Sequence, residues 1–188
     1  MNGRIFVTKK EAYRVEATSL LAQLHHDLGL TQIEDVVLYN VYDVFNADEH
    51  DMELLKKSVL SEVVTDTVLD DLSLDGKTLI AYECLPGQYD QRADSAQQCL
   101  MLLNNKQDVV IKSGKIVVLE GTLSEDDVTR IKQYLINPVE MREKDLSVLA
   151  FEEDVGDLLA TVRTRKSSGR SISFSSQWRL INLQNSSP

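Results

Sequence analysis

Cysteine is scarce in this sequence, and long hydrophobic runs are absent. The 188 residues include two cysteines, Cys84 and Cys99, which are too few and too isolated for a disulfide framework or a zinc site. No apolar run approaches the length of a bilayer-spanning helix, and the N-terminus, with Arg4 before the short stretch 5–7, does not resemble a signal peptide. We therefore expect a soluble cytoplasmic protein with no membrane partner.

Positive charge is also in short supply. The net charge is −10, which argues against a nucleic-acid partner because phosphate contacts need clustered cations. The segment 161–188 carries +5, so the first 160 residues carry −15 by difference. The composition changes near Gly156. We predict a folded domain at 1–150, followed at 151–188 by a linker and a basic, Ser-rich tail with too few large apolar residues to fold alone.

The motifs of common catalytic sites are missing as well. Neither G-x-x-x-x-G-K-[ST] nor G-x-G-x-x-G occurs. Cys84 and Cys99 lie in a predicted strand and a predicted helix, not on the Gly-flanked turn that a nucleophilic cysteine needs. The acidic run 48–51 fits the first turn of a helix, where the helix dipole favours carboxylates. We predict no catalytic residue, no metal ligand and no cofactor-binding residue in this chain.

What the sequence does contain is an alternation of strand-like and helix-like segments. Thr8 with Glu11, Asn46 with Glu49 and Ser124 with Asp127 have the form of helix starts. The connector 61–76 offers two short strand candidates, at 63–64 and 68–69, and Ser113-Gly114-Lys115 is predicted to be the turn of a hairpin. The predicted strands are 3–7, 35–45, 79–84, 109–111 and 116–119, and the predicted buried helix positions are Ala17, Leu20, Leu21, Leu24, Leu28, Met52, Leu55, Val59, Ala93, Ala96, Leu100, Leu103, Val128, Ile131, Tyr134 and Leu135.

This pattern occurs twice, in halves at about 3–62 and 78–139. The offset stays near 75 residues, as from Ile5 to Ile80, although the halves share negligible sequence identity. Apolar faces of this kind are buried when one sheet is covered by helices. We therefore predict an α+β fold in which two pseudo-repeated βαβ-type halves form one sheet with helices packed on one face.

The stretch Leu85–Ala96 lies near the middle of the chain, where a strand ends in a Pro-Gly loop that leads into a helix. It supplies the candidate interface or anion-binding residues, which are Pro86, Gly87, Gln88, Asp90, Gln91, Arg92, Asp94 and Ser95. Two interpretations follow from physics alone. Asp90 or Asp94 could cap the helix while Arg92 stays solvated. Alternatively, the helix N-terminus and the Arg92 guanidinium could receive an anion.

The same stretch, Leu-Pro-Gly-Gln-Tyr-Asp-Gln-Arg-Ala-Asp-Ser-Ala, closely resembles one near the start of phosphoribosylformylglycinamidine synthase, a glutamine-dependent ligase of purine biosynthesis. Three further segments resemble that family: Arg4–Lys10 its first strand, Val41–Phe45 its second, and Tyr134–Val139 the end of the last helix of the domain. The resemblance extends from about Arg4 to about Val148. It stops before every catalytic domain of the family.

The resemblance implies an N-terminal domain shaped like a fused pair of small PurS-like subunits. Such a domain bridges the synthase and glutaminase domains, its protein partners, and carries no catalytic residue, while the whole enzyme uses ATP and Mg. We therefore expect a truncated, rearranged or altered-frame product that is inactive alone and whose uncovered surface favours self-association. The alternative is a βαβ-type regulatory module that binds a small molecule with Arg92.

Overall fold

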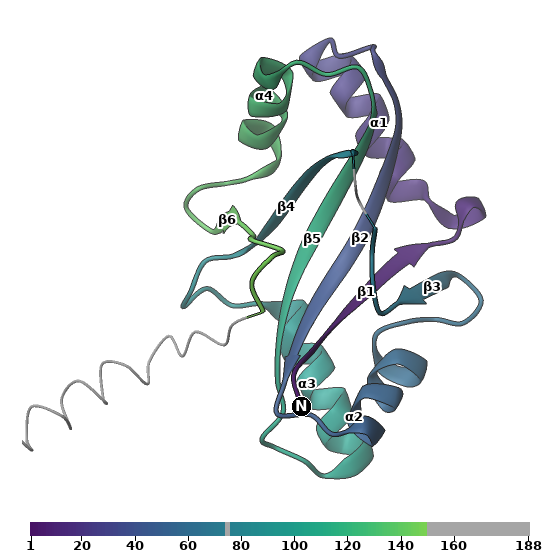
Figure 1. The fold of residues 1–188 in the computed structure, drawn as a ribbon, viewed down its shortest axis with the longest axis vertical. Coiled ribbons are helices and arrows are strands. Elements are labelled where there is room, and N and C mark those ends of the chain that lie inside the picture. Colours follow the sequence, from purple (N-terminus) through teal and green to yellow (C-terminus); the bar gives the residue numbers. More distant parts are fainter. Residues whose placement is uncertain (74–75, 150–188) are drawn as a thin grey trace, which may run out of the picture. The chain divides into compact units, whose positions relative to one another are not determined.

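The computed structural model describes residues 1–73 and 76–149, all of which belong to one compact unit, Met1–Phe151. The described residues form one antiparallel six-stranded sheet, in the order β3-β1-β2-β5-β4-β6, together with four α-helices (Figure 1). The predicted α+β class is therefore confirmed. The tail predicted at 151–188 lies outside the described residues. Among the described helices, none combines the length and apolarity needed to cross a membrane.

Strands and helices alternate along most of the chain. A short 3-10 turn, Glu11–Tyr13, precedes α1, and a π-helical turn, Leu55–Val59, continues α2. The elements in chain order are β1 (Gly3–Lys9), α1 (Val15–Leu28), β2 (Ile33–Phe45), α2 (Glu49–Leu54), β3 (Asp66–Leu69), β4 (Thr78–Cys84), α3 (Gln91–Asn104), β5 (Val110–Gly121), α4 (Glu125–Leu135) and β6 (Met141–Glu143).

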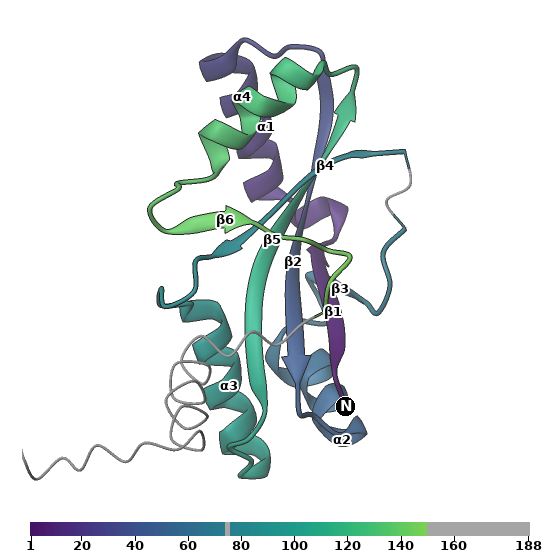
Figure 2. The ribbon, with the colours of Figure 1, turned by 60° about the vertical axis from the view of Figure 1, so that its left-hand side comes forward.

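The long strands β2 and β5 form the centre of the sheet. They pair from Ile33 opposite Gly121 to Phe45 opposite Val110. A shorter strand pairs in antiparallel fashion on either side. Ile5 of β1 lies opposite Tyr42 of β2, and Ile80 of β4 lies opposite Val117 of β5. The edges are formed by the four-residue β3 and the three-residue β6, which lies beside β4 in Figure 2. Such short edges offer little backbone for pairing with other chains.

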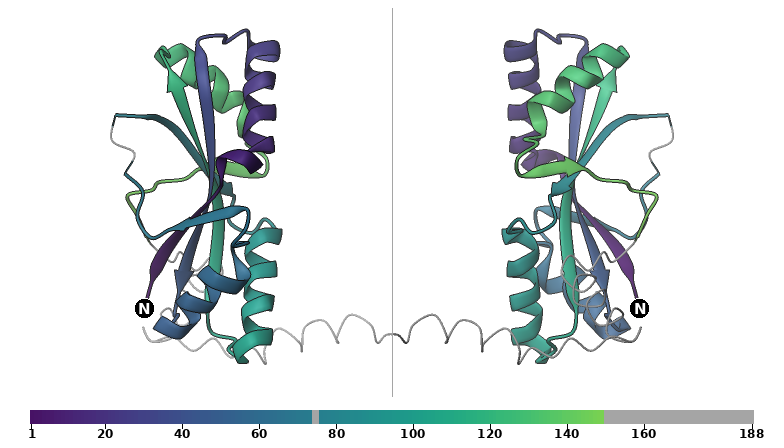
Figure 3. Two further views of the ribbon diagram at one scale, coloured as in Figure 1. Left: turned by 90° about the vertical axis from the view of Figure 1, so that its right-hand side faces the viewer. Right: turned by 90° about the vertical axis from the view of Figure 1, so that its left-hand side faces the viewer.

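The helices contact each other in pairs at opposite ends of the sheet. α1 contacts α4 at one end and α2 contacts α3 at the other (Figure 1). An apolar cluster lies under each helix pair, and alternate residues of β2 contribute to both clusters. Val36 packs with α1 and α4, whereas Tyr42 and Val44 pack with α2 and α3. α1 and α3 lie on the same side of the sheet in Figure 3. One face of the sheet therefore carries two separate apolar clusters, one at each end.

The opposite face of the sheet has its own apolar cluster. Phe6, Val41 and Ile116 are buried there, and Leu72 and Leu146 pack against this group. These two leucines come from the β3–β4 connection and from the chain after β6, which lie on the side away from the helices in Figure 3. Within residues 1–73 and 76–149, this face is therefore covered by irregular chain and not by helices.

The hairpin predicted around Ser113-Gly114-Lys115 is wrong, because β5 runs unbroken through these residues. Gly114 pairs with Val41 on one side and with Glu83 on the other. A Cβ at this position would lie 2.9 Å from the Tyr82 carbonyl oxygen and 3.0 Å from Cδ of Lys144. Gly114 is therefore needed for close packing in the middle of the sheet, whereas the sequence pattern suggested a turn.

Two of the three predicted helix starts are also wrong. β1 continues through Thr8, and α1 begins at Val15 after Arg14, which provides no side-chain cap. α2 is capped by Asp48 and not by Asn46, which adopts φ 60° before the helix. The third start is confirmed, because Ser124 and Asp127 form a reciprocal capping box on α4.

Of the connector strands, 68–69 is confirmed within β3, whereas 63–64 lies in a turn. Most predicted core positions of the helices are buried or partly buried. Two predicted core positions are wrong, because Leu103 is 55% exposed and Tyr134 is 41% exposed. α3 buries Ala93, Ala96 and Leu100 and turns Leu103 toward solvent.

Candidate functional site

The Pro-Gly loop before α3 is a tight turn on the surface. The Gln88 amide donates to the Leu85 carbonyl over 3.0 Å, and Gly87 adopts φ +82°. A positive φ at this position explains the glycine, because other residues are strained there. Pro86, Gly87 and Gln88 are exposed. The loop therefore presents its side chains outward while fixing where α3 begins.

Asp90 is the cap of α3. One carboxylate oxygen accepts from the Ala93 amide over 3.0 Å and from the Ser113 hydroxyl over 2.8 Å, and the other accepts from the Ser113 amide over 2.9 Å. Asp90 thus ties the helix start to β5, and of the two predicted capping residues it is the one that caps. Ser113 could not be predicted as its partner, because the two residues are 23 positions apart in the sequence.

Asp94 lies on the outer side of the first helical turn. It accepts hydrogen bonds from the Tyr89 hydroxyl and from the Gln98 side-chain amide, each over 2.8 Å. The bond to the Asp94 carboxylate raises the pKa of Tyr89, because it favours the protonated phenol. Both acidic candidates are therefore engaged by neighbouring donors.

Gln91, Arg92 and Ser95 face an open cleft of about 540 Å³. The other residues that line it are Tyr42, Val59, Leu60, Ala96 and Cys99. Within the described part of the chain, the side chains of Gln91, Arg92 and Ser95 form no hydrogen bond or ion pair. The structure thus brings three of the eight candidate residues together. Their neighbours come from β2, the end of the π-helical turn and α3, and only the α3 residues could be placed near Arg92 from helical spacing.

A smaller cavity of about 190 Å³ lies on the other side of Arg92, over β4 and β5. Its lining includes Asp90, Lys115 and Cys84. Burial, followed by the Asp90, Glu140 and Glu83 charges, raises the pKa of the Cys84 thiol. A thiol in this setting stays protonated, which makes it a poor nucleophile. Cys99 is exposed and borders the larger cleft.

The acidic run at the start of α2 is part of the fold. Asp48 caps the helix, and Asp51 completes the reciprocal capping box. Lys106, which follows α3, contacts the carboxylates of both residues. Its hydrogen bond lowers the pKa of Asp48 to about 2. Across residues 1–73 and 76–149, no group of three metal-ligating side chains comes together.

A charged cluster on the far face of the sheet had no signal in the sequence. Asp43 is buried, accepting from Nε of Arg4 over 2.5 Å and from Nζ of Lys144 over 2.7 Å. Lys144 also contacts Glu83 over 2.5 Å. Arg4 donates in addition to the Leu146 carbonyl. The cluster therefore holds the chain after β6 against β1, β2 and β4, and each buried charge is matched by another.

Neither family models nor curated proteins give a match to this chain.

Proposed function

We propose that this chain is the N-terminal, PurS-like domain of a glutamine-dependent phosphoribosylformylglycinamidine synthase. Its role is to hold the synthase and glutaminase domains of that ligase together, and it supplies no catalytic residue to the reaction. The proposal depends first on the resemblance of Leu85–Ala96 and of three further segments to that family. The partner domains and the purine pathway follow from this resemblance alone.

The matched spacing of strands, helices and caps along the chain is the single observation that best supports a fused pair of small subunits. A shift of 75 residues carries the pair Ile5–Tyr42 onto Ile80–Val117. A shift of 76 carries α1 onto α3, both fourteen residues long. The same shift carries the Asp48 capping box onto that of Ser124. Strands, helices and caps thus repeat together, as gene duplication and fusion of one subunit would produce.

The way in which the helices pair also favours a fused dimer. α1 of the first half packs on α4 of the second, and α2 of the first packs on α3 of the second. Each apolar cluster on the helix face therefore draws on both halves, as in a dimer whose subunits share one core. Each half alone would lack part of the apolar surface that covers its helices.

A bridging role also suits the surface of the candidate site. Gln88 and Arg92 are exposed, and Asp90 fixes the backbone beneath them. Exposed polar side chains on a rigid support can form the rim of a protein interface without taking part in chemistry.

The test is reconstitution in trans. Synthase and glutaminase domains of the family, produced as separate chains, would be mixed with the 188-residue protein. We expect co-elution on gel filtration and an increased rate of glutamine-dependent amidation. Arg92→Glu should weaken retention, whereas Lys57→Glu, which reverses an exposed charge on the π-helical turn after α2, should not. Failure to bind either domain at micromolar concentration, with no change in rate, would overturn the proposal.

A further inference from the structure

We propose that the cleft beside α3, lined by Tyr42, Leu60, Arg92 and Ser95, binds a small organic anion. The anionic group lies at Arg92 and Ser95, and the apolar body of the ligand lies against Leu60 and Ala96. This site would operate in the chain alone and does not depend on the bridging role.

Among the described residues that line the cleft, Arg92 is the one that carries a charge, because neither nearby acid, Asp90 or Asp94, lines it. Asp90 points toward Ser113, and Asp94 accepts from Tyr89 and Gln98. Arg92 has no ion-pair partner among the described residues, and its guanidinium is the cation that borders the cleft. A guanidinium recognises carboxylates and phosphates through paired N–H donors.

The helical spacing sets other polar groups beside Arg92. Ser95 follows it by three residues and Cys99 by seven, so all three lie along one side of α3. The Ser95 hydroxyl has no protein partner within the described ranges and can donate to the same anion. The first turn of a fourteen-residue helix adds the positive end of its dipole.

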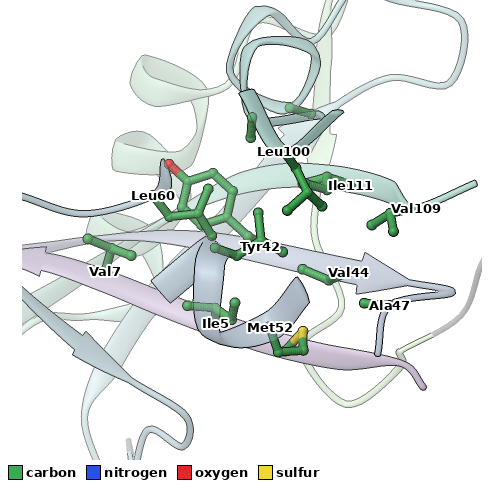
Figure 4. Close-up of a cluster of buried hydrophobic side chains, with 13 residues drawn as sticks. Ile5, Val7, Tyr42, Val44, Ala47, Met52, Leu60, Leu100, Val109 and Ile111 are labelled. Carbon is green, nitrogen blue, oxygen red and sulfur yellow. The ribbon is translucent and has the colours of Figure 1, made fainter. Parts of the chain in front are cut away.

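The strongest indication of a ligand is Tyr42, in the wall of the cleft. Its side chain is buried, with only 3% exposure, yet its hydroxyl forms no hydrogen bond with any described residue. In the described part of the chain, no fully enclosed side-chain N or O lacks a partner. The Tyr42 oxygen must therefore meet the open space of the cleft. Figure 4 shows the ring over Ile5 with its hydroxyl beside Leu60.

A hydroxyl that opens onto the cleft and has no partner among the described residues is available to a ligand that binds there in place of water. The cleft also has the size of a ligand site. Its volume of about 540 Å³ lies within the range of small-molecule pockets. Val59, Leu60 and Ala96 give it one apolar side, while Arg92, Ser95 and Tyr42 give it donors. A ligand with one anionic group and a ring or short apolar body would match these two sides of the cleft.

The test is a ¹H–¹⁵N NMR titration of the full chain with phenyl phosphate, benzoate and neutral benzyl alcohol. We expect saturable shifts at Tyr42, Leu60 and residues 91–99 with at least one of the two anions, and weaker binding of the alcohol. Arg92→Ala should raise the Kd by about tenfold, the effect of losing one charged hydrogen bond. Tyr42→Phe, which keeps the ring and the fold, should raise it about threefold.

Lys77→Ala is the matched control, because it changes the net charge equally but lies just before β4, outside the cleft. Its Kd should stay within twofold of the parent protein. Tighter binding of phenyl phosphate or of benzoate would identify the anion class. The proposal is overturned if neither anion shifts these residues at 10 mM, or if Lys77→Ala weakens binding as much as Arg92→Ala does. Neither result would affect the reconstitution test of the bridging role.

Discussion

The first turns of α1 and α3 each border a cleft, and the residues that they place there carry opposite charges. At a spacing of 76 residues, Ala17 and Leu24 of α1 correspond to Ala93 and Leu100 of α3, and all four are buried. Glu16 corresponds to Arg92, and each lines a cleft. The two helices therefore have the same residue types at these buried positions, whereas the residues that border the clefts differ in charge.

The difference extends to the partners of these two residues. Glu16 contacts Lys115 from β5, so the charges of these two residues offset each other. Arg92 has no such partner among the described residues, so its guanidinium is left unpaired at the α3 cleft. Because fold and site can vary independently, the shared scaffold says little about what each end binds. The distinction between the two clefts depends on a few exposed side chains.

The variants with the largest expected effect on stability test whether the two ends of the sheet unfold as one unit. Leu24→Ala and Leu100→Ala each empty a fully buried position and should each cost about 2–5 kcal/mol of unfolding free energy. Because each cluster draws on both halves, both variants should still unfold in one transition. The measurement is urea unfolding followed by circular dichroism and by NMR signals from each end. Separate transitions at the two ends would contradict a shared core.

Leu102→Ala is the control for this pair, because Leu102 lies on α3 but is 83% exposed. Its effect on the unfolding free energy should stay within about 0.5 kcal/mol.

The capping boxes allow a second, smaller comparison. Ser124→Ala removes the cap of α4 and should cost about 1 kcal/mol. Asp48→Ala should lower the melting temperature more, because it removes both the cap of α2 and the contact with Lys106. Thermal unfolding of the two variants side by side gives the ranking. Equal shifts would mean that Lys106 adds nothing to the α2 cap.

These caps also show where the sequence was sufficient. The capping box of Ser124 and Asp127 was predicted correctly because its two residues are only three positions apart in the sequence. Thr8 with Glu11 has the same local form, but β1 continues through Thr8 to pair with Tyr39. Long-range pairing of this kind overrides a local signal. The α+β class and the places of β1, β2 and β4 could be predicted from their apolar residues, whereas β5 was predicted as two strands and β6 was not predicted.

Contacts between distant residues could not be predicted. Gly114 was predicted to lie in a turn, because no residue near it in the sequence indicates that the Lys144 side chain packs against it. The candidate site was found only in part for the same reason. Arg92 and Ser95 stand out within one helix, whereas Tyr42 and Leu60 reach the same cleft through the pairing of β2 with β5 and the packing of α3.

The acid dependence of stability should differ between the two capping boxes. Hydrogen bonds lower the pKa of both Asp48 and Asp127, but only Asp48 has a lysine as the main cause, and its pKa falls to about 2. A lowered carboxylate pKa gives stability that is complete above the unfolded value of 3.8 and is lost as the pH falls toward 2. Unfolding experiments on the parent protein should therefore show stability falling across this window.

Lys106→Met should raise the pKa of Asp48 toward its ordinary value and leave that of Asp127 unchanged. Carboxyl ¹³C shifts followed from pH 5 to pH 1.5 measure both groups in one sample. An unchanged Asp48 titration in Lys106→Met would show that the backbone cap, and not the ammonium, sets its pKa.

The smallest change in stability, and the sharpest test of the two clefts, comes from Glu16→Gln. Glu16 is largely exposed, so losing its contact with Lys115 should cost less than about 1 kcal/mol of unfolding free energy. The substitution leaves Lys115 unneutralised at the border of the α1 cleft. We then expect phenyl phosphate or benzoate to shift Val15–Gln23 as well as the α3 cleft. Gln23→Ala, in the same cleft, leaves the ion pair intact and should add no such shifts. If Glu16→Gln gains no anion binding, a free cation beside a helix start is not sufficient, and the buried Tyr42 hydroxyl becomes the feature that distinguishes the α3 cleft.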